Sequence, residues 1–299
     1  MEILMNVIAQ GLIFSIAAFG VYITYRILDF PDLSVDGTFP LGAAVTGLCL
    51  LKGVNPYVAC VLSFGIGCIA GTLTGLLHVK LKITNLLSGI LVMIALYSIN
   101  LRIMGKSNIP LFGKQTIFSS GVDILVILFA FMIIVKVGLD LFLKTKLGFV
   151  LKAVGDNQQL VASLSINPDN IKLIGLAISN GLVALSGSMM AQYQGFSDVG
   201  MGTGIVVMGL AAVIIGESLF SRIRVFNPTT TALLGSMIYK GSIAVALMLG
   251  LPSTDLKLIT SVIVILALSL DRKKLNFKNK KVKVGGESFV KNTKSAQSI

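Results

Sequence analysis

The side chains in this sequence that could do chemistry are few, and the densest group lies between two prolines. Two carboxylates and two hydroxyls fall between Pro31 and Pro40. They belong to Asp32, Ser34, Asp36 and Thr38. Such groups bind cations, polar solutes or backbone N–H groups. We interpret all four as candidates for a translocation pathway, and capping of the following helix by the Asp36 carboxylate is an equally good interpretation of that residue.

Two further polar side chains, Asn180 and Lys240, interrupt otherwise apolar runs. Asn180 is a pathway candidate, although hydrogen bonding between helices is the commoner role of an amide in such a run. Lys240 is costly at membrane depth unless it is paired. It could meet a substrate carboxylate, but a structural partner such as Asp198 or Glu217 is the stronger expectation.

Little else in the chain could build a catalytic centre. His78 is the single histidine and there is no tryptophan, which excludes sites made of several imidazoles. The motifs GxSxG, HExxH and GxxxxGK[ST] do not occur. We therefore expect neither an enzyme nor an ATPase, and no metal or cofactor in this chain.

The composition distinguishes a membrane protein from a water-soluble one. Of the 299 residues 55% are hydrophobic and 13% are charged, whereas soluble domains carry about 25% charged residues. The apolar residues come in runs of roughly 15 to 25, long enough to cross a hydrocarbon core of ~30 Å. The sequence predicts an all-α, polytopic transmembrane helix bundle of about 8–10 spans.

Nine apolar segments define the predicted membrane domain, which covers residues 1–270. They are residues 5–25, 37–51, 57–77, 85–103, 123–143, 171–191, 200–216, 229–251 and 256–270. In the fifth, Lys136 and Asp140 are four residues apart and are expected to pair with each other or to reach the membrane interface. In the third, Gly67, Gly71 and Gly75 form a face of small residues that predicts close contact with another helix.

The second segment, 37–51, is too short to span by itself, so it must recruit the polar stretch before it. Pro31, Gly37 and Pro40 are not expected to lie in one smooth helix. A broken or re-entrant helix is the natural outcome, because irregular backbone at depth survives only where protein buries it or where it lines a cavity. An ordinary cytoplasmic turn is the alternative.

The basic residues predict the orientation. Residues 271–299 hold nine Lys or Arg and two acidic residues, more than half of the net charge of +12. This disordered tail is expected in the cytoplasm, in contact with anionic lipids rather than with nucleic acid. Loops 26–36, 78–84, 144–170 and 217–228 would then be inside. The N-terminus and loops 52–56, 104–122, 192–199 and 252–255 would be outside.

The longest polar stretch, 144–170, has apolar residues at helical spacing on both sides of Gly155-Asp156-Asn157. This pattern predicts two short amphipathic helices joined by a turn. They could dock a cytoplasmic partner or lie on the lipid surface.

The same loop resembles the coupling loop of bacterial ABC importer permeases of the branched-chain amino acid/monosaccharide permease family. The residues that carry the resemblance are Leu147-Gly148, Lys152-Ala153-Val154-Gly155, Asn157, Ala162 and Ser165-Ile166-Asn167, where Ser165 replaces a usual glycine. Asp32-Leu33-Ser34-Val35 resembles the DLSVG motif of the sugar permeases, with Asp36 inserted before Gly37. The stretches ITNLLSGI (83–90) and NLRIMGK (100–106) are similar to a subgroup of uncharacterised permease components.

The resemblance, which covers residues 5–270, implies a permease subunit in the bacterial plasma membrane, paired with a second copy of itself. It implies two cytoplasmic ATP-binding subunits, which hold ATP and Mg, and an extracytoplasmic solute-binding lipoprotein. ATP would drive alternating access through the loop. The coupling residues would be Gly148, Lys152, Ala153, Gly155, Asn157 and Ala162, with Ala153, Gly155 and Asn157 touching the ATPase.

A secondary transporter driven by ions or protons, without an ATPase, is the competing hypothesis, since such proteins also have broken helices and buried carboxylates. The loop pattern argues against it. By resemblance alone, the best expectation for the substrate is an amino acid, with an aromatic one as a candidate.

Overall fold

The computed structural model describes residues 2–220, 227–250, 258, 260–262 and 264–265. Within them, seven helices are long and apolar enough to cross a membrane, and an eighth apolar helix is shorter. The long ones are α1 (Glu2–Val21) with its π-helical extension η1 (Tyr22–Ile27), α3 (Pro56–Val79), α4 (Asn85–Met104), α5 (Ile124–Lys144), α8 (Pro168–Gln194) and α10 (Pro228–Met248). The seventh span, Val199–Phe220, is made of the 3-10 turn η3 followed by the short helix α9 (Ile205–Phe220).

The shorter helix is α2 (Val35–Leu51). The predicted all-α polytopic bundle is confirmed by these eight helices. Most of the predicted ninth segment, 256–270, and all of the basic tail, 271–299, lie outside the described residues.

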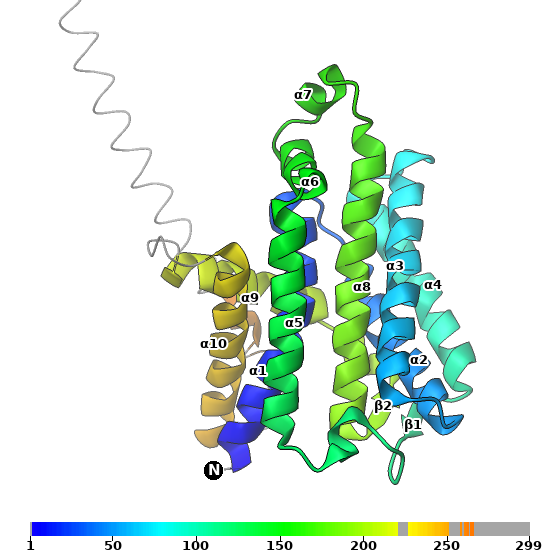
Figure 1. Cartoon of the computed structure of the whole chain (residues 1–299), viewed down its shortest axis with the longest axis vertical. Coiled ribbons are helices and arrows are strands. Elements are labelled where there is room, and N and C mark those ends of the chain that lie inside the picture. Colours follow the sequence, from blue (N-terminus) through cyan, green and yellow to red (C-terminus); the bar gives the residue numbers. More distant parts are fainter. Residues whose placement is uncertain (1, 221–226, 251–257, 259, 263, 266–299) are drawn as a thin grey trace, which may run out of the picture.

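The short elements mark the two ends of the bundle (Figure 1). One end carries α6 (Lys146–Asp156) and α7 (Gln158–Ser163). At the other end β1 (Asn108–Pro110) pairs antiparallel with β2 (Phe196–Asp198), close to the 3-10 turns η2 (Ile117–Ser120) and η3 (Val199–Gly202). Loops 78–84 and 144–170 share the first end, and loops 52–56, 104–122 and 192–199 share the second, as the sequence grouped them.

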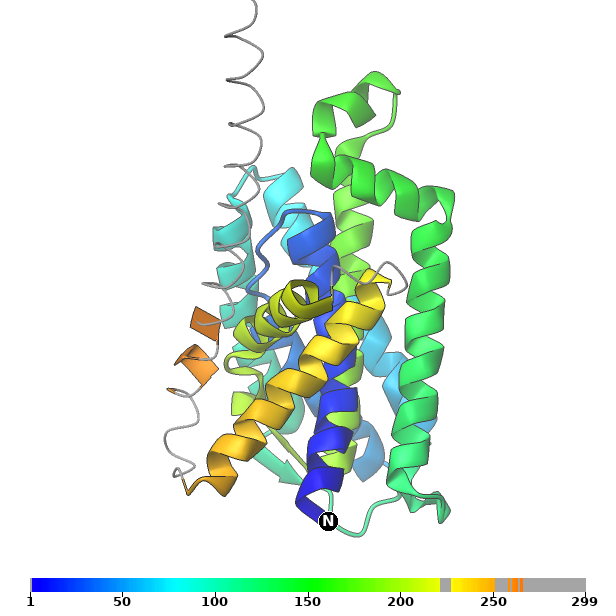
Figure 2. The ribbon, with the colours of Figure 1, turned by 90° about the vertical axis from the view of Figure 1, so that its left-hand side faces the viewer.

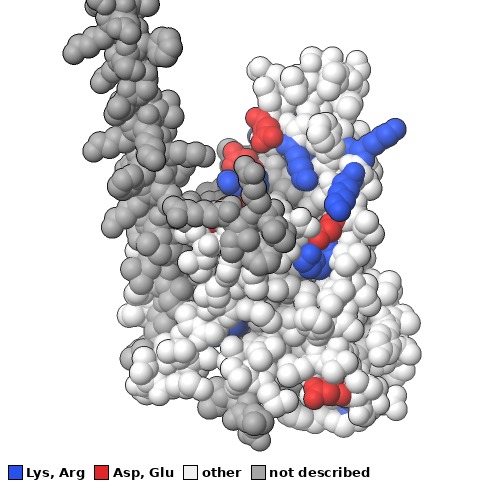
Figure 3. Space-filling model, turned by 60° about the vertical axis from the view of Figure 1, so that its left-hand side comes forward, with Lys and Arg blue, Asp and Glu red and all other residues white. Residues whose placement is uncertain are grey.

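Charge follows the same division. On the face drawn in Figure 3, charged side chains gather toward the end with α6 and α7, and the band below is almost uncharged. An uncharged band flanked by charge is what a helix bundle in lipid requires, because charged groups are expensive in hydrocarbon.

The centre of the bundle is built from small residues. A Cβ atom at Gly67 or Gly71 of α3 would collide with the α8 backbone at Asn180 or Leu176, and one at Gly75 would collide with Leu173. The predicted close contact of this glycine face is therefore confirmed. It lets α3 run along α8 at a short distance, while α10 runs along α1 (Figure 2).

Two units of the chain have the same sequence of elements. In the first, α1 with η1 is followed by an irregular segment (28–34), the short α2 and then α3. In the second, α8 is followed by a non-α-helical segment (195–204) that holds β2 and η3, then by the short α9 and α10. The first unit packs its α3 on α8 and the second its α10 on α1. Repeats with broken helices of this kind are a common plan for membrane transporters.

The broken helix was predicted correctly, but the break lies earlier than the prolines suggested. α2 is continuous from Val35 to Leu51 and contains Pro40. Pro40 removes only the bond that its nitrogen would donate to the carbonyl of Asp36, near the start of the helix, and α2 tolerates that loss. The interruption falls before Val35, where the backbone leaves η1 through Asp29 with a φ of 50°.

Candidate functional site

The first break places the predicted acidic and hydroxyl residues at the middle of the bundle. α2 begins at Ser34, next to Asn180, which lies near the middle of α8. One Asp32 carboxylate oxygen accepts the Ser34 backbone N–H at 2.8 Å, and the other accepts Asn180 Nδ2 at 2.8 Å. The Asp32 side chain is thus held by both α2 and α8.

Asn180 is the hub of this network. Its Oδ1 atom accepts the hydroxyls of Thr38 at 2.7 Å and Ser34 at 3.2 Å, and its Nδ2 atom also donates to the Leu176 carbonyl at 3.2 Å. Asp32, Ser34, Thr38 and Asn180 are all buried. The structure therefore brings four of the six predicted pathway residues into one cluster, whose hydrogen bonds join α2 to α8.

Asp36 does cap a helix, but a different one from the helix that the sequence suggested. Its two carboxylate oxygens accept the backbone N–H groups of Val206 at 2.8 Å and Gly204 at 3.0 Å, at the start of α9. A carboxylate at this position balances the positive end of the helix dipole. Capping of its own helix, α2, was the wrong assignment. The carboxylate instead accepts the N–H of Gly204, which is 168 residues away in the sequence.

A cavity of about 480 Å³ lies beside this cap. Its wall is formed by the start of α2, by α4 and by residues 199–203. Asn100 of α4 is buried in that wall and donates Nδ2 to the Gly37 carbonyl at 3.1 Å. Among the described residues, its Oδ1 atom is the one buried side-chain N or O atom without a hydrogen-bond partner.

Asn100 had no assigned role in the sequence analysis, although a buried amide in an apolar span was a usable signal. An unsatisfied buried acceptor is destabilising, so Asn100 is a polar group in this wall whose hydrogen bonding the described chain does not complete. The cavity and the Asp36 cap together form the candidate pathway site.

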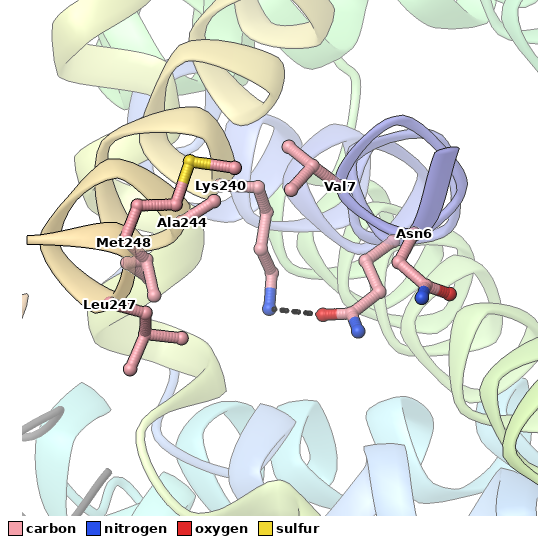
Figure 4. Close-up of a pocket in the computed structure, with 8 residues that line it drawn as sticks. Asn6, Val7, Lys240, Ala244, Leu247 and Met248 are labelled. Carbon is pink, nitrogen blue, oxygen red and sulfur yellow. Dashed lines mark hydrogen bonds between the residues drawn. The ribbon is translucent and has the colours of Figure 1, made fainter. Parts of the chain in front are cut away.

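Lys240 lies elsewhere, in a second cavity of about 330 Å³ between α1 and α10. Figure 4 shows its side chain reaching toward Gln10, whose Oε1 atom is 3.4 Å from Nζ. The ammonium group also sits 3.7 Å from the centroid of the Phe14 ring. Of the predicted pathway residues, Lys240 is the one placed away from the break.

The predicted partners of Lys240 were wrong. Asp198 instead accepts Gly200 N at 2.7 Å and caps η3, and Glu217 pairs with Arg26 at 2.9 Å. The other prediction for a lysine within a span is confirmed, because Lys136 and Asp140 pair at 2.8 Å.

The predicted coupling loop forms the two expected short helices, α6 and α7. Asn157 separates them and caps α7, since its Oδ1 atom accepts Leu160 N at 3.1 Å. Lys152, Asn157 and Ala162 are exposed and Ala153 is partly buried.

Gly148 and Gly155 face inward. A Cβ atom at Gly148 would collide with Phe142 and Leu143 of α5, and one at Gly155 would collide with the Ile27 carbonyl of η1. These two glycines connect α6 to the bundle, so the surface left for a partner is formed by other residues of the loop.

Ser165 has a φ of 60°, in the left-handed region where glycine is the least strained residue. This conformation explains why the resembling loops have glycine at the corresponding place.

An all-α membrane bundle with broken helices beside a cavity and a structured loop at one end is the architecture of a transport permease. Residues 3–269 match the family model described as the permease component of the branched-chain amino acid transport system. The chain belongs to this family, whose members are membrane subunits of ABC-type transport systems.

Curated relatives agree. The chain is 52% identical over 281 residues, 94% of its length and 95% of the relative's, to a tyrosine transport system permease protein of Clostridioides difficile. It is 35% identical to an uncharacterized protein, RP368, of Rickettsia prowazekii, covering 90% of this chain and 98% of that one. An autoinducer 2 import system permease protein, LsrC, of Photorhabdus luminescens is 29% identical over 62% of this chain and 57% of its own. No solved structure was found to match.

Proposed function

We propose that this permease component imports a small organic solute, an amino acid, by alternating access, and that the solute passes the break between α1 and α2. The observation that carries the proposal is the meeting of two half-helix starts at mid-depth. α2 begins beside Asn180, and α9 begins on the Asp36 carboxylate next to a cavity of about 480 Å³. Irregular backbone at membrane depth is tolerated where it lines a cavity, and such breaks hold the substrate in many transporters.

An aromatic amino acid is the proposed substrate. The support is the name of a relative, the tyrosine transport system permease protein that shares 52% of its residues with this chain. Tyr97 adds a physical reason, because its ring lies on the cavity wall and is 56% exposed. An aromatic ring there can pack against the ring of a solute.

Two cytoplasmic ATP-binding subunits are the proposed source of energy, with ATP and Mg bound to them and no cofactor in this chain. Their docking surface would be the outer face of α6 and α7. Phe149, Leu160 and Leu164 expose 73%, 56% and 65% of their surface there. Exposed apolar side chains at the charged end of a membrane protein favour a protein partner. The exposed Lys152, Asn157 and Ala162 would surround them.

The inward-facing Gly148 and Gly155 would pass movement of the loop to α5 and η1. Under this proposal α6 and α7 lie in the cytoplasm, together with the basic tail. A second copy of the chain would complete the pathway, and a solute-binding lipoprotein would deliver the solute to the opposite end, where β1 and β2 lie.

Reconstitution in liposomes with the ATP-binding subunits tests the proposal. We expect uptake of L-tyrosine that requires ATP. Replacing Phe149 with Asp should abolish binding of the ATP-binding subunits and with it ATP-dependent uptake, whereas the same change at Phe112, which is 79% exposed just after β1, should leave that binding unchanged. Equal uptake by the chain alone, driven by an ion gradient, would instead show a secondary transporter.

A further inference from the structure

The cavity between α1 and α10 contains a cation that the pathway described above does not use. The nearest groups to the Lys240 ammonium are neutral: Gln10 Oε1 at 3.4 Å and the Phe14 ring at 3.7 Å. Among the described residues, Lys240 forms no ion pair with a carboxylate. A lysine ammonium can donate three hydrogen bonds, and a charge within a membrane span is costly unless an opposite charge balances it.

Lys136 shows how the same fold balances a lysine for purely structural reasons. It also lies within a span, but its ammonium group donates a hydrogen bond to Asp140 at 2.8 Å. Asp140 in turn accepts a hydrogen bond from the Thr229 hydroxyl at 2.5 Å. Lys240 has no equivalent of Asp140 in the described chain. Among the described residues, the opposite charge for Lys240 is thus missing, and a bound anion would supply it.

The shape and chemistry of the cavity indicate what kind of group that is. Asn6 and Gln10 place amide groups near Lys240, and both can donate hydrogen bonds (Figure 4). The rest of the wall is apolar, formed by Val7, Ile243, Ala244, Leu247 and Met248. A volume of about 330 Å³ is within the range of small-molecule sites. One cation, two amides and an apolar wall fit an oxyanion attached to an apolar body.

We propose that this cavity is an oxyanion-binding site in which Lys240 Nζ receives a carboxylate or phosphate, with Asn6 and Gln10 as further donors. The carboxylate of the transported amino acid is one source of this chemistry. The phosphate of an anionic lipid headgroup is the other, because the cavity extends from Lys240 to Met248 at the end of α10. The first source rests on the proposed function and the second does not.

The site is also connected to the broken helix. The Phe14 ring, which lies against the Lys240 ammonium, stacks on Phe39 of α2 at 5.7 Å with an interplanar angle of 10°. Phe39 follows Thr38, a member of the Asn180 network. An oxyanion that draws Lys240 away from Phe14 would therefore change the packing on α2.

Equilibrium binding to the complete transporter in lipid nanodiscs tests the solute source. The probe is radiolabelled L-tyrosine, with 3-(4-hydroxyphenyl)propanoate, which keeps only the carboxylate, and tyramine, which keeps only the amine, as competitors. We expect the acid to compete and tyramine to compete poorly. Lys240→Met should weaken binding by about tenfold or more, as expected for loss of a charged hydrogen bond, and Lys240→Arg should largely restore it. Lys136→Met is the matched control and should not change it.

Native mass spectrometry of the same preparations tests the lipid source. Phosphatidylglycerol retained by the wild type and by Lys136→Met, but lost from Lys240→Met, would assign the site to the headgroup. Equal tyrosine binding and equal lipid retention in folded Lys240→Met, checked by thermal unfolding, would overturn the proposal. Absence of tyrosine uptake by the wild type would contradict the proposed substrate, and the lipid measurement would still decide whether the oxyanion site exists.

Discussion

The two breaks in the bundle have the same place in the order of elements but use their polar groups differently. The first, 28–34, leads into a helix start with Asp32, Ser34 and Asp36, whose side chains bond to the other unit. The second, 195–204, uses its carboxylate, Asp198, within the break to cap η3, and offers the backbone N–H of Gly204 to the first unit. The Asp36 carboxylate of the first unit binds the N–H groups of the second.

This difference teaches that the two units are complementary rather than equivalent. One carries negative charge at depth and the other provides the positive end of a helix dipole that balances it. If the units move against each other during transport, the hydrogen bonds between Asp36 and α9 must either move with both units or break. The predictions below test this division of roles, beginning with the largest expected effect.

Replacing Asp32 with Asn should have the largest effect on stability. The amide would keep one acceptor oxygen, but its NH2 group would face a group that already donates, either Ser34 N or Asn180 Nδ2. Each buried polar group left unsatisfied in this way costs about 1–3 kcal/mol. Thermal unfolding in detergent would show the loss. Asp29→Asn, an exposed position in the same break, is the control, and an equal loss there would show that the network around Asp32 is unimportant.

Replacing Gly202 with Ala tests the second break. A Cβ atom there would collide with the Asp36 carbonyl and with Pro40. Overpacking of this kind costs about 1–3 kcal/mol, and because it pushes residues 199–204 away from α2 it should also reduce uptake. Gly200→Ala is a milder comparison, since only the Asp198 carboxylate lies near its Cβ position, at 3.0 Å. Wild-type uptake by a stable Gly202→Ala variant would mean that close approach of the units is not needed.

Replacing Asp36 with Asn should have an intermediate effect confined to α9. The neutral amide keeps one acceptor and loses the charge, so about 1–2 kcal/mol of capping energy is at risk. Hydrogen exchange should increase in the first turn of α9 and not in α2. An increase in α2 instead would favour the capping role that was one of its two predicted roles, as the cap of its own helix.

Replacing Ser165 with Gly should have the smallest effect and the opposite sign. It lies outside both breaks, is exposed and has a φ of 60°. Relief of the left-handed strain is partly offset by the larger entropy that glycine loses on folding, so a gain of about 0.5 kcal/mol or less is expected. The thermal midpoint should rise slightly while uptake stays the same. A clear loss of uptake would indicate that Ser165 contacts the ATPase.

Much of the architecture could be predicted because it depends on local properties. The apolar runs around 57–77, 85–103 and 123–143 predict their helices, since length and hydropathy alone decide whether a segment suits a bilayer. The turn at Gly155-Asp156-Asn157 predicted the division between α6 and α7, and Asn157 does cap α7.

The candidate site was only partly predictable. Four residues were each suspected because a polar group at membrane depth is costly unless it has partners. In the structure these four, Asp32, Ser34, Thr38 and Asn180, are hydrogen-bonded to one another in a single cluster. The Lys240 partners failed because charge alone does not say which helices are neighbours. Asn100 was overlooked because its empty acceptor can be seen only after the wall around it is formed.

Hydropathy and turn chemistry act between residues close together in the chain, so the places of the long helices and the two short helices of the loop 144–170 follow from the order of residues. The Asp36 contact with α9, the Asn180 network and the surroundings of Lys240 join residues that are 142 to 230 positions apart. Such contacts depend on how closely the glycine faces allow the helices to approach each other. That distance is set by tertiary packing and not by the local sequence.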